Sequence, residues 1–173
     1  MNPEDGPNRA MLEAVAQRIY PLLRNVVFVG GQVAELLVTD HAAVRVRPTK
    51  DVDVIVSAAS RTAFTELEQQ VSRLGLRHDQ SEGAPICRWV TPEGFLLDLM
   101  PVDQPILGFS NRWYQAATEG CVGYPLSEEL VIQIPTAPVF LATKLEAYLG
   151  RGEGDILGSH DLEDVITVVA GRP

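Results

Sequence analysis

The segment from Asp51 to Val56, which reads Asp-Val-Asp-Val-Ile-Val, constrains the fold of this chain more than any other. Its short, β-branched character predicts a buried strand. Side chains alternate along a strand, so Asp51 and Asp53 share one face while the three valines pack on the other. Two carboxylates about 4 Å apart repel each other by roughly 4 kcal/mol at an effective dielectric near 20. The pair therefore has to share a proton, reach water or bind a cation.

Strand-like and helix-like segments alternate along the chain, which is typical of an α/β domain. The expected helices are 8–24, 32–39, 61–74, 138–149 and 160–170, and the expected strands are 26–29, 51–56, 86–90, 95–102, 121–124 and 130–134. Gly75 is expected to end helix 61–74, the turn Thr91–Gly94 to join 86–90 and 95–102 as a hairpin, and the segment 111–120 to be irregular. We expect one domain over residues 1–173, with a central mixed sheet, the acidic strands at its middle and helices packed on it. Residues 1–8 are expected to be disordered, and the C-terminal helices, within 138–170, are expected to belong to the same domain.

Length and composition bound the class of protein. The 173 residues are 46% hydrophobic, which suffices for the core of one domain. No apolar run approaches the ~20 residues that cross a bilayer, and the first eight residues resemble no signal sequence, so we expect a soluble, cytoplasmic protein. A net charge of -9 argues against a broad nucleic-acid surface, although a local basic site remains open. Cys87 and Cys121 are expected to be buried free thiols.

A third acid stands alone in another apolar strand. Asp98 lies between Phe95 and Met100, with no other charged residue nearby. If Asp98 converges with Asp51 and Asp53, three carboxylates would form an oxygen-only site that suits Mg²⁺ better than zinc, which takes His or Cys ligands. The alternative is that the pair lines a solvent-facing edge and that Asp98 caps a bulge, because acids are depleted in strand interiors without being absent.

Gly30 and Gly31 follow the first predicted strand and precede a helix. Glycines at such a junction let the backbone approach a phosphate closely and leave the N–H groups of the first helical turn available. A Gly-Gly pair alone more often marks a tight turn. It therefore favours a phosphate site only in combination with the acids.

Basic residues occupy two positions that favour an anion. Arg45 and Arg47 alternate onto one face and, with Lys50, form the only dense basic cluster, directly before the acidic pair. A solvated loop remains open as the alternative. Lys144 lies on the apolar stripe of its predicted helix, so it needs an anion unless its stem is buried and its ammonium reaches water. Asp161 is the nearest candidate partner, or else a residue that only caps the last helix.

Taken in order, these features resemble the nucleotidyltransferase superfamily that includes DNA polymerase beta. The ordered set is a strand, Gly30-Gly31, a helix, the pair Asp51-Val52-Asp53 and the later Asp98. The segments Ala142–Leu145 (Ala-Thr-Lys-Leu) and His160–Asp164 (His-Asp-Leu-Glu-Asp) are similar to a pattern of the AbiEii-type, toxin-like branch. The resemblance covers most of the chain.

The resemblance implies a nucleotidyltransferase fold and a Mg²⁺- or Mn²⁺-dependent transfer of a nucleoside monophosphate from a triphosphate such as ATP to an acceptor hydroxyl. It implies that Asp51, Asp53 and Asp98 ligate one or two metal ions, and that Lys144 and Asp161 complete the catalytic site. It places the triphosphate against the Gly30-Gly31 turn. Together with the basic segment before the acids, the candidate nucleotide-binding residues are Gly30, Gly31, Gln32, Arg47, Thr49, Lys50 and Lys144. Many relatives carry Ser or Thr where this chain has Gln32, so the resemblance assigns no hydroxyl contact to phosphate.

Several functions remain open within this resemblance. The acceptor can be an RNA end such as that of tRNA, a protein side chain or a small molecule such as an antibiotic. The toxin-like branch also implies a toxin–antitoxin system with an antitoxin partner. A catalytically silent binding or antitoxin-like module of the same fold is one alternative. Another phosphoryl-transfer enzyme, such as a kinase, is less favoured because the Gly-rich run from Gly150 to Gly158 lacks the spacing and lysine of a P-loop and is better described as a lid or linker.

Overall fold

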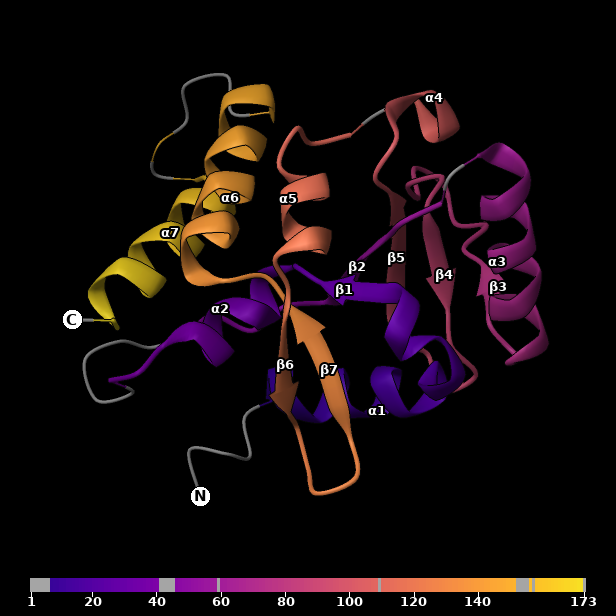
Figure 1. Ribbon diagram of the computed structural model, residues 1–173, viewed down its shortest axis with the longest axis horizontal. Helices are drawn as coiled ribbons and strands as arrows, with labels where there is room; N and C mark the ends of the chain where they lie inside the picture. The colour runs from indigo at the N-terminus through magenta and orange to yellow at the C-terminus, as the bar shows by residue number, and fades with distance from the viewer. Residues whose placement is uncertain are drawn as a thin grey trace.

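A five-stranded mixed sheet in the order β1-β2-β5-β4-β3 forms the centre of the protein (Figure 1). The computed structural model describes residues 7–40, 46–58, 60–108, 110–151, 156 and 158–172. The strands are β1 (Val26–Phe28), β2 (Asp51–Val56), β5 (Leu96–Pro101), β4 (Arg88–Val90) and β3 (Arg77–His78). β2 and β5 are parallel, and the other three neighbouring pairs are antiparallel. The predicted α/β class, with the acidic strands central in a mixed sheet, is confirmed.

One face of the sheet packs on helices α1 (Pro7–Arg18) and α3 (Arg61–Arg73). The valines of β2 and the leucines of β5 meet the apolar sides of both helices in one large cluster. Members of that cluster that are at most 2% exposed include Leu12, Val52, Phe64, Leu97 and Leu99. This face is therefore closed by apolar packing, as the alternation of Asp and Val along β2 predicts.

The opposite face of the sheet is covered over one part only. Val27, Ile55 and Met100 pack there against α5 (Tyr114–Glu119) and against Val139 of α6 (Ala137–Arg151). Helix α7 (His160–Ala170) lies beside α6 and reaches α2 (Gly31–Leu37) (Figure 1). The three acids of β2 and β5 project from the rest of this face, opposite residues of α6 and the start of α7.

The remaining elements lie outside the main sheet. β6 (Val122–Pro125) and β7 (Val131–Ile134) form a separate antiparallel pair that extends away from the main sheet (Figure 1). β7 packs against β1 and against the 3₁₀ helix η2 (Tyr20–Asn25), while α4 (Gln104–Leu107) follows β5.

The first predicted helix, 8–24, is interrupted. α1 ends at Arg18, and the chain continues as η2, in which Pro21 occupies the first turn. Proline has no N–H for a helical hydrogen bond and disfavours the α conformation of Tyr20 before it, so a continuous helix is not formed there.

The predicted disorder of residues 1–8 is wrong for Pro7 and Asn8, which belong to α1. Asn8 is 3% exposed, and its side chain binds the backbone of the segment before β2. Residues 1–6 lie outside the described part of the chain. The predicted loop 150–158 also begins late, because α6 continues to Arg151; residues 152–155 and 157 are outside the described part.

Local signals at turns were predicted well, whereas short elements were missed. Gly75 has a φ of +90° directly after α3, as expected of a glycine that ends a helix. β4 and β5 form the predicted hairpin around Thr91–Gly94. The segment 111–120, expected to be irregular, contains α5, whose Ala117 is fully buried against the sheet. A helix this short depends on tertiary packing, which its own sequence does not reveal.

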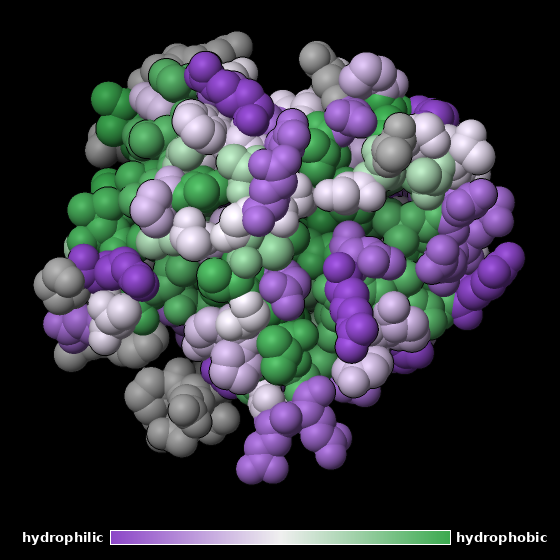
Figure 2. Space-filling model, in the orientation of Figure 1, coloured by the Kyte–Doolittle hydropathy of each residue, from purple (hydrophilic) through white to green (hydrophobic). Residues whose placement is uncertain are grey.

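Hydrophilic side chains cover much of the face seen in Figure 2, and apolar ones gather on the side where α6 and α7 lie. The exposed apolar residues of these two helices are Leu145, Leu149, Ile166 and Val169. In the part of the chain that the structure describes, no helix combines the length and apolar character that a membrane span requires.

Candidate active site

The three predicted acids lie side by side on the two central strands. Asp53 and Asp98 are direct partners in the parallel register of β2 and β5, and Asp51 precedes Asp53 by two residues on the same face. Asp98 is 7% exposed, and the other two carboxylates are half-buried. The Gly30 backbone lies directly against Asp53, because a Cβ added to Gly30 would be 2.1 Å from Asp53 Oδ2. The sheet therefore brings the glycine turn and the acids together.

Arg88, on β4, binds two of these three acids. Its Nε donates to Asp98 Oδ1 at 2.8 Å, and its Nη2 donates to Asp98 Oδ2 at 2.8 Å and to Asp51 Oδ2 at 2.6 Å. Asp98 is also the register partner of Arg88 across β4 and β5. The hydrogen bonds to Asp98 raise the pKa of Arg88 above its ordinary value, so the guanidinium stays charged.

The donor set of the acids fits Mg²⁺, but their conformation favours Arg88. Three carboxylates on one face supply the hard oxygen ligands that Mg²⁺ takes. Among the described residues, however, no three acidic, histidine or cysteine side chains are grouped as the ligands of one metal ion would be. Asp51 and Asp98 instead direct oxygens at the guanidinium.

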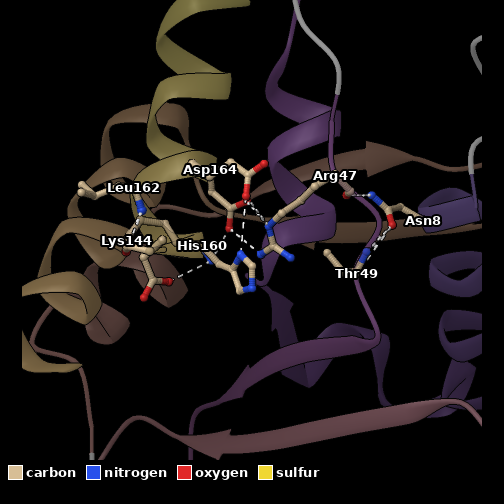
Figure 3. Close-up of polar contacts among 10 residues, drawn as sticks. Asn8, Arg47, Thr49, Lys144, His160, Leu162 and Asp164 are labelled. Carbon is tan, nitrogen blue, oxygen red and sulfur yellow. Dashed lines mark hydrogen bonds and ion pairs between the residues drawn. The ribbon is translucent and has the colours of Figure 1, made fainter. Parts of the chain in front are cut away.

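A second charged cluster joins the segment before β2 to α6 and α7 (Figure 3). Lys144 Nζ lies 2.6 Å from Asp164 Oδ2 and 3.3 Å from Asp161 Oδ1. Arg47 Nε lies 3.5 Å from Asp164 Oδ1 and 3.5 Å from Glu163 Oε2. Asp164 is only 2% exposed, so it is a buried anion between two cations. Lys144 thus has the anionic partner that its apolar stripe requires, and the alternative of an ammonium in water does not hold.

Asn8 fixes the segment that carries Arg47 (Figure 3). Its Nδ2 donates to the carbonyl of Arg47 at 2.8 Å, and its Oδ1 accepts from the N–H of Thr49 at 2.8 Å. Both backbone groups are satisfied by one buried side chain, which therefore ties α1 to the approach of β2. This contact directs Arg47 towards α7.

A cavity of about 470 Å³ lies over the acids, a volume typical of a small-molecule site. Its charged and hydroxyl-bearing lining includes every residue predicted to be catalytic: Asp51, Asp53, Asp98, Lys144 and Asp161, together with Arg47, Thr49, Arg88 and Tyr148. A second cavity of about 90 Å³ shares Asp53, Lys144 and Asp161 with it and reaches Gly30. Lys50 is exposed and lines neither cavity, and Arg45 lies outside the described residues.

Gln32 is 1% exposed, and neither atom of its amide has a hydrogen-bond partner among the described residues. Its Oε1 lies 2.5 Å from the position of a Cβ added to Gly30, so the amide is next to the Asp53 side of the site. A buried polar atom without a partner costs about 1–3 kcal/mol. Such atoms in a native protein call for an explanation, for which a ligand or a water is a usual candidate.

Sequence reasoning missed Arg88 and assigned no role to Asp164. The turn Thr91–Gly94 was predicted, and counting outwards from it places Arg88 opposite Asp98. Asp164 lies with Thr167 and Val168 at helical spacing on the buried side of α7. Both residues could be found from the sequence only after the β4–β5 register, for Arg88, and the buried side of α7, for Asp164, had been worked out.

Cys87 and Cys121 are free thiols, and Cys87 is buried as expected, whereas Cys121 is only half-buried. Burial, with a contribution from the charge of Asp98, raises the pKa of the Cys87 thiol from 9.0 to about 12. Cys87 is therefore a protonated core residue beside the site and not a nucleophile.

The fold is similar to that of a solved antigenic nucleotidyltransferase-like protein from Paracoccidioides brasiliensis. The TM-score is 0.59 at 17% sequence identity, and the likeness covers 94% of this chain and 75% of that chain. No protein-family model matches the sequence, and no curated protein shows significant similarity to it. The chain therefore has a nucleotidyltransferase-like fold. The toxin-like branch and the role of each site residue stay predictions.

Proposed function

We propose that this chain is a Mg²⁺-dependent nucleotidyltransferase that moves a nucleoside monophosphate from a nucleoside triphosphate to an acceptor hydroxyl. The observation that carries the proposal is the convergence in one cavity of three acids, Lys144 and Asp161. These residues come from two strands and two helices that are far apart in the sequence. The nucleotidyltransferase-like fold supports the same assignment.

The acids of the cavity act on the acceptor and the metal ion, and its cations act on the phosphates. Asp53 and Asp98, side by side in the register of β2 and β5, hold the acceptor hydroxyl, and a carboxylate oxygen of this pair receives its proton. Mg²⁺ or Mn²⁺ bound to the acids supplies Lewis acidity and offsets the charge of the departing pyrophosphate. Lys144 and Arg47 contribute positive charge to the phosphates from the other wall.

The Gly30 turn and Gln32 shape the side of the site next to Asp53. A Cβ at position 30 would be 2.1 Å from Asp53 Oδ2, so glycine lets the Asp53 carboxylate lie in contact with the start of α2, where we place the phosphates. The buried amide of Gln32 replaces the hydroxyl that many relatives carry, and a phosphate oxygen or a ligand-bound water completes its hydrogen bonds.

The acceptor we place first is an RNA end, as in the toxin-like branch, with a cognate antitoxin as partner. The described basic surface beside the acids is small, because Arg47 is paired with acids of α7 and Lys50 alone projects outwards. RNA binding should therefore fall only shallowly with salt, with a slope between about -1 and -2 if Lys50 and at most Arg47 contact phosphates. A protein side chain and a small hydroxylated molecule are the alternatives.

A catalytically silent binding module of the same fold is the second candidate function. The observation that favours it is the binding of Arg88 to Asp51 and Asp98, which leaves no preformed three-carboxylate group in the described residues. A silent module would still bind a nucleotide or a partner, but it would not transfer any label.

The test supplies the full chain with Mg²⁺ and with each triphosphate labelled at the α-phosphate or at the γ-phosphate. Total RNA, protein extract and a panel of small hydroxylated molecules are offered in turn as acceptors. Asp53→Asn is the blank, and Glu66→Gln, an exposed acid of α3 on the opposite face of the sheet, is the control of equal charge change. We expect α label on an acceptor, lost in Asp53→Asn and kept in Glu66→Gln. Transfer of γ label alone would identify a kinase, and no transfer would favour the silent module.

A further inference from the structure

Four charged side chains form a row across the middle of the sheet. Asp51 and Asp53 on β2, Asp98 on β5 and Arg88 on β4 project from the same face, because each neighbouring pair is in register or two residues apart. The row contains three anions and one cation. Arg88 bonds to two of the three anions, Asp98 and Asp51, at 2.8 Å or less.

The guanidinium of Arg88 uses the oxygens that a metal ion would need. Both oxygens of Asp98 and Oδ2 of Asp51 accept its hydrogen bonds. A Mg²⁺ ion binds carboxylate oxygens at about 2.1 Å, so an ion on the same oxygens would stand only about 4 Å from the guanidinium nitrogens. Two unit positive charges at that separation repel by about 4 kcal/mol at an effective dielectric near 20, and the ion is divalent. Guanidinium and metal therefore compete for Asp98.

Arg88 is placed to leave these oxygens without unfolding its strand. Its side chain is 19% exposed and lines the cavity over the acids, so the guanidinium can rotate into the cavity while β4 keeps its pairing. β4 is paired with β5 on one side, where Arg88 lies opposite Asp98, and with β3 on the other, where Trp89 lies opposite His78. The backbone of Arg88 therefore stays fixed when its side chain moves.

We infer that Arg88 is an internal cation that holds Asp51 and Asp98 in the absence of metal and exchanges with the metal ion when it binds. The inference rests on the proposed function, because it concerns the same carboxylates. Its consequence is that metal affinity is set by competition: the wild-type protein binds Mg²⁺ more weakly than its three carboxylates alone would.

The first measurement is a calorimetric titration of the nucleotide-free, full-length protein with Mn²⁺. The variant is Arg88→Gln, and the matched control is Arg77→Gln, which removes the same charge from an exposed position on the adjacent strand β3. Loss of a competing charge-assisted contact should tighten Mn²⁺ binding by roughly tenfold or more in Arg88→Gln. Arg77→Gln should bind Mn²⁺ as the wild type does.

The second measurement uses the wild-type protein and does not depend on a variant's folding. In protein with ¹⁵N-labelled arginine, the Nε–H of Arg88 should be protected from solvent exchange in metal-free buffer because it is bonded to Asp98. Arg88→Lys identifies the signal by its absence. We expect saturating Mg²⁺ to shift this signal and remove its protection, while the signals of other arginines stay unchanged.

The outcomes separate this inference from the proposed function. Equal or weaker Mn²⁺ binding by Arg88→Gln, with binding abolished in Asp53→Asn, would overturn the exchange and leave the metal-dependent function standing. Retained protection of the Arg88 Nε–H at saturating Mg²⁺ would overturn it as well. Binding by Arg88→Gln but not by the wild type would support the internal cation and contradict catalysis by the natural chain. No binding by any form would overturn both.

Discussion

Replacing Asp164 by asparagine should destabilise the protein more than any other single neutralisation of an acid on α7. Asp164 is 2% exposed and lies 2.6 Å from Lys144 and 3.5 Å from Arg47. Asparagine keeps the shape of the side chain but removes the charge. Two cations that are themselves mostly buried, 13% and 22% exposed, then lose their shared anion.

The magnitude follows from what each cation retains. Removal of one partner from a buried ion pair typically costs about 3–5 kcal/mol. Here Lys144 keeps Asp161 at 3.3 Å and Arg47 keeps Glu163 at 3.5 Å, and both cations are partly screened by water, so we expect about 2–3 kcal/mol. With an unfolding entropy of about 2.1 cal/mol/K for each of 173 residues, this loss lowers Tm by about 6–8 °C.

Urea denaturation followed by circular dichroism measures the free energy of unfolding, and a thermal scan gives Tm. The matched control is Glu163→Gln, one residue away, whose side chain is 52% exposed and contacts Arg47 at 3.5 Å. That variant should change the free energy of unfolding by less than about 0.5 kcal/mol. Equal losses in the two variants would refute the reasoning, because they would show that burial between two cations gives Asp164 no special role.

Three further predictions concern the Gly30 turn and the two cysteines. Gly30→Ala should abolish the rise in Tm that a nucleoside triphosphate gives with Mg²⁺, because its Cβ would be 2.1 Å from Asp53 Oδ2. The control Gly150→Ala, whose added Cβ meets open space, should keep that rise. A rise retained in both variants would contradict the close approach of Gly30 to Asp53. At pH 8 a thiol reagent should modify folded protein at Cys121 but reach Cys87 only after unfolding, which Cys121→Ser checks by removing the fast reaction. Because the pKa of Cys87 is 9.0 when exposed and about 12 when folded, the unfolded chain loses this proton first, and the free energy of unfolding should fall as the pH rises above 9.

The part of the fold that could be predicted is the part set by short-range pattern. β2 and α3 were predicted within a residue of their observed ends, because the alternation of β2 and the helical spacing of α3 are each repeated several times. Gly75 also marks the end of α3. Helix α5 was missed because it has only six residues, and its stability comes from packing against the sheet. The break after α1 depends on one residue, Pro21.

Some residues of the candidate site could also be predicted from local pattern, and others could not. The acids of β2 could be predicted because two charges in an apolar strand conflict with local expectation. Arg88 could not be predicted in this way, because an arginine in a hairpin strand is ordinary until the strand register places it opposite Asp98. The bonds of Asn8 to the segment before β2 join residues 39 and 41 positions apart, and no local pattern contains that information.

The ion pair between Arg47 and Asp164 has a consequence for the order of events during synthesis. These residues are 117 positions apart, whereas Asn8 meets the segment before β2 across only 41. At ribosomal rates of about 5–20 residues per second, α7 emerges on the order of ten seconds after Arg47. During that interval a nascent chain can form the sheet and align its acids while Arg47 lacks its buried anion, and Lys144 itself is made only late in the interval. The wall of the cavity opposite the acids is therefore completed last, when α7 docks.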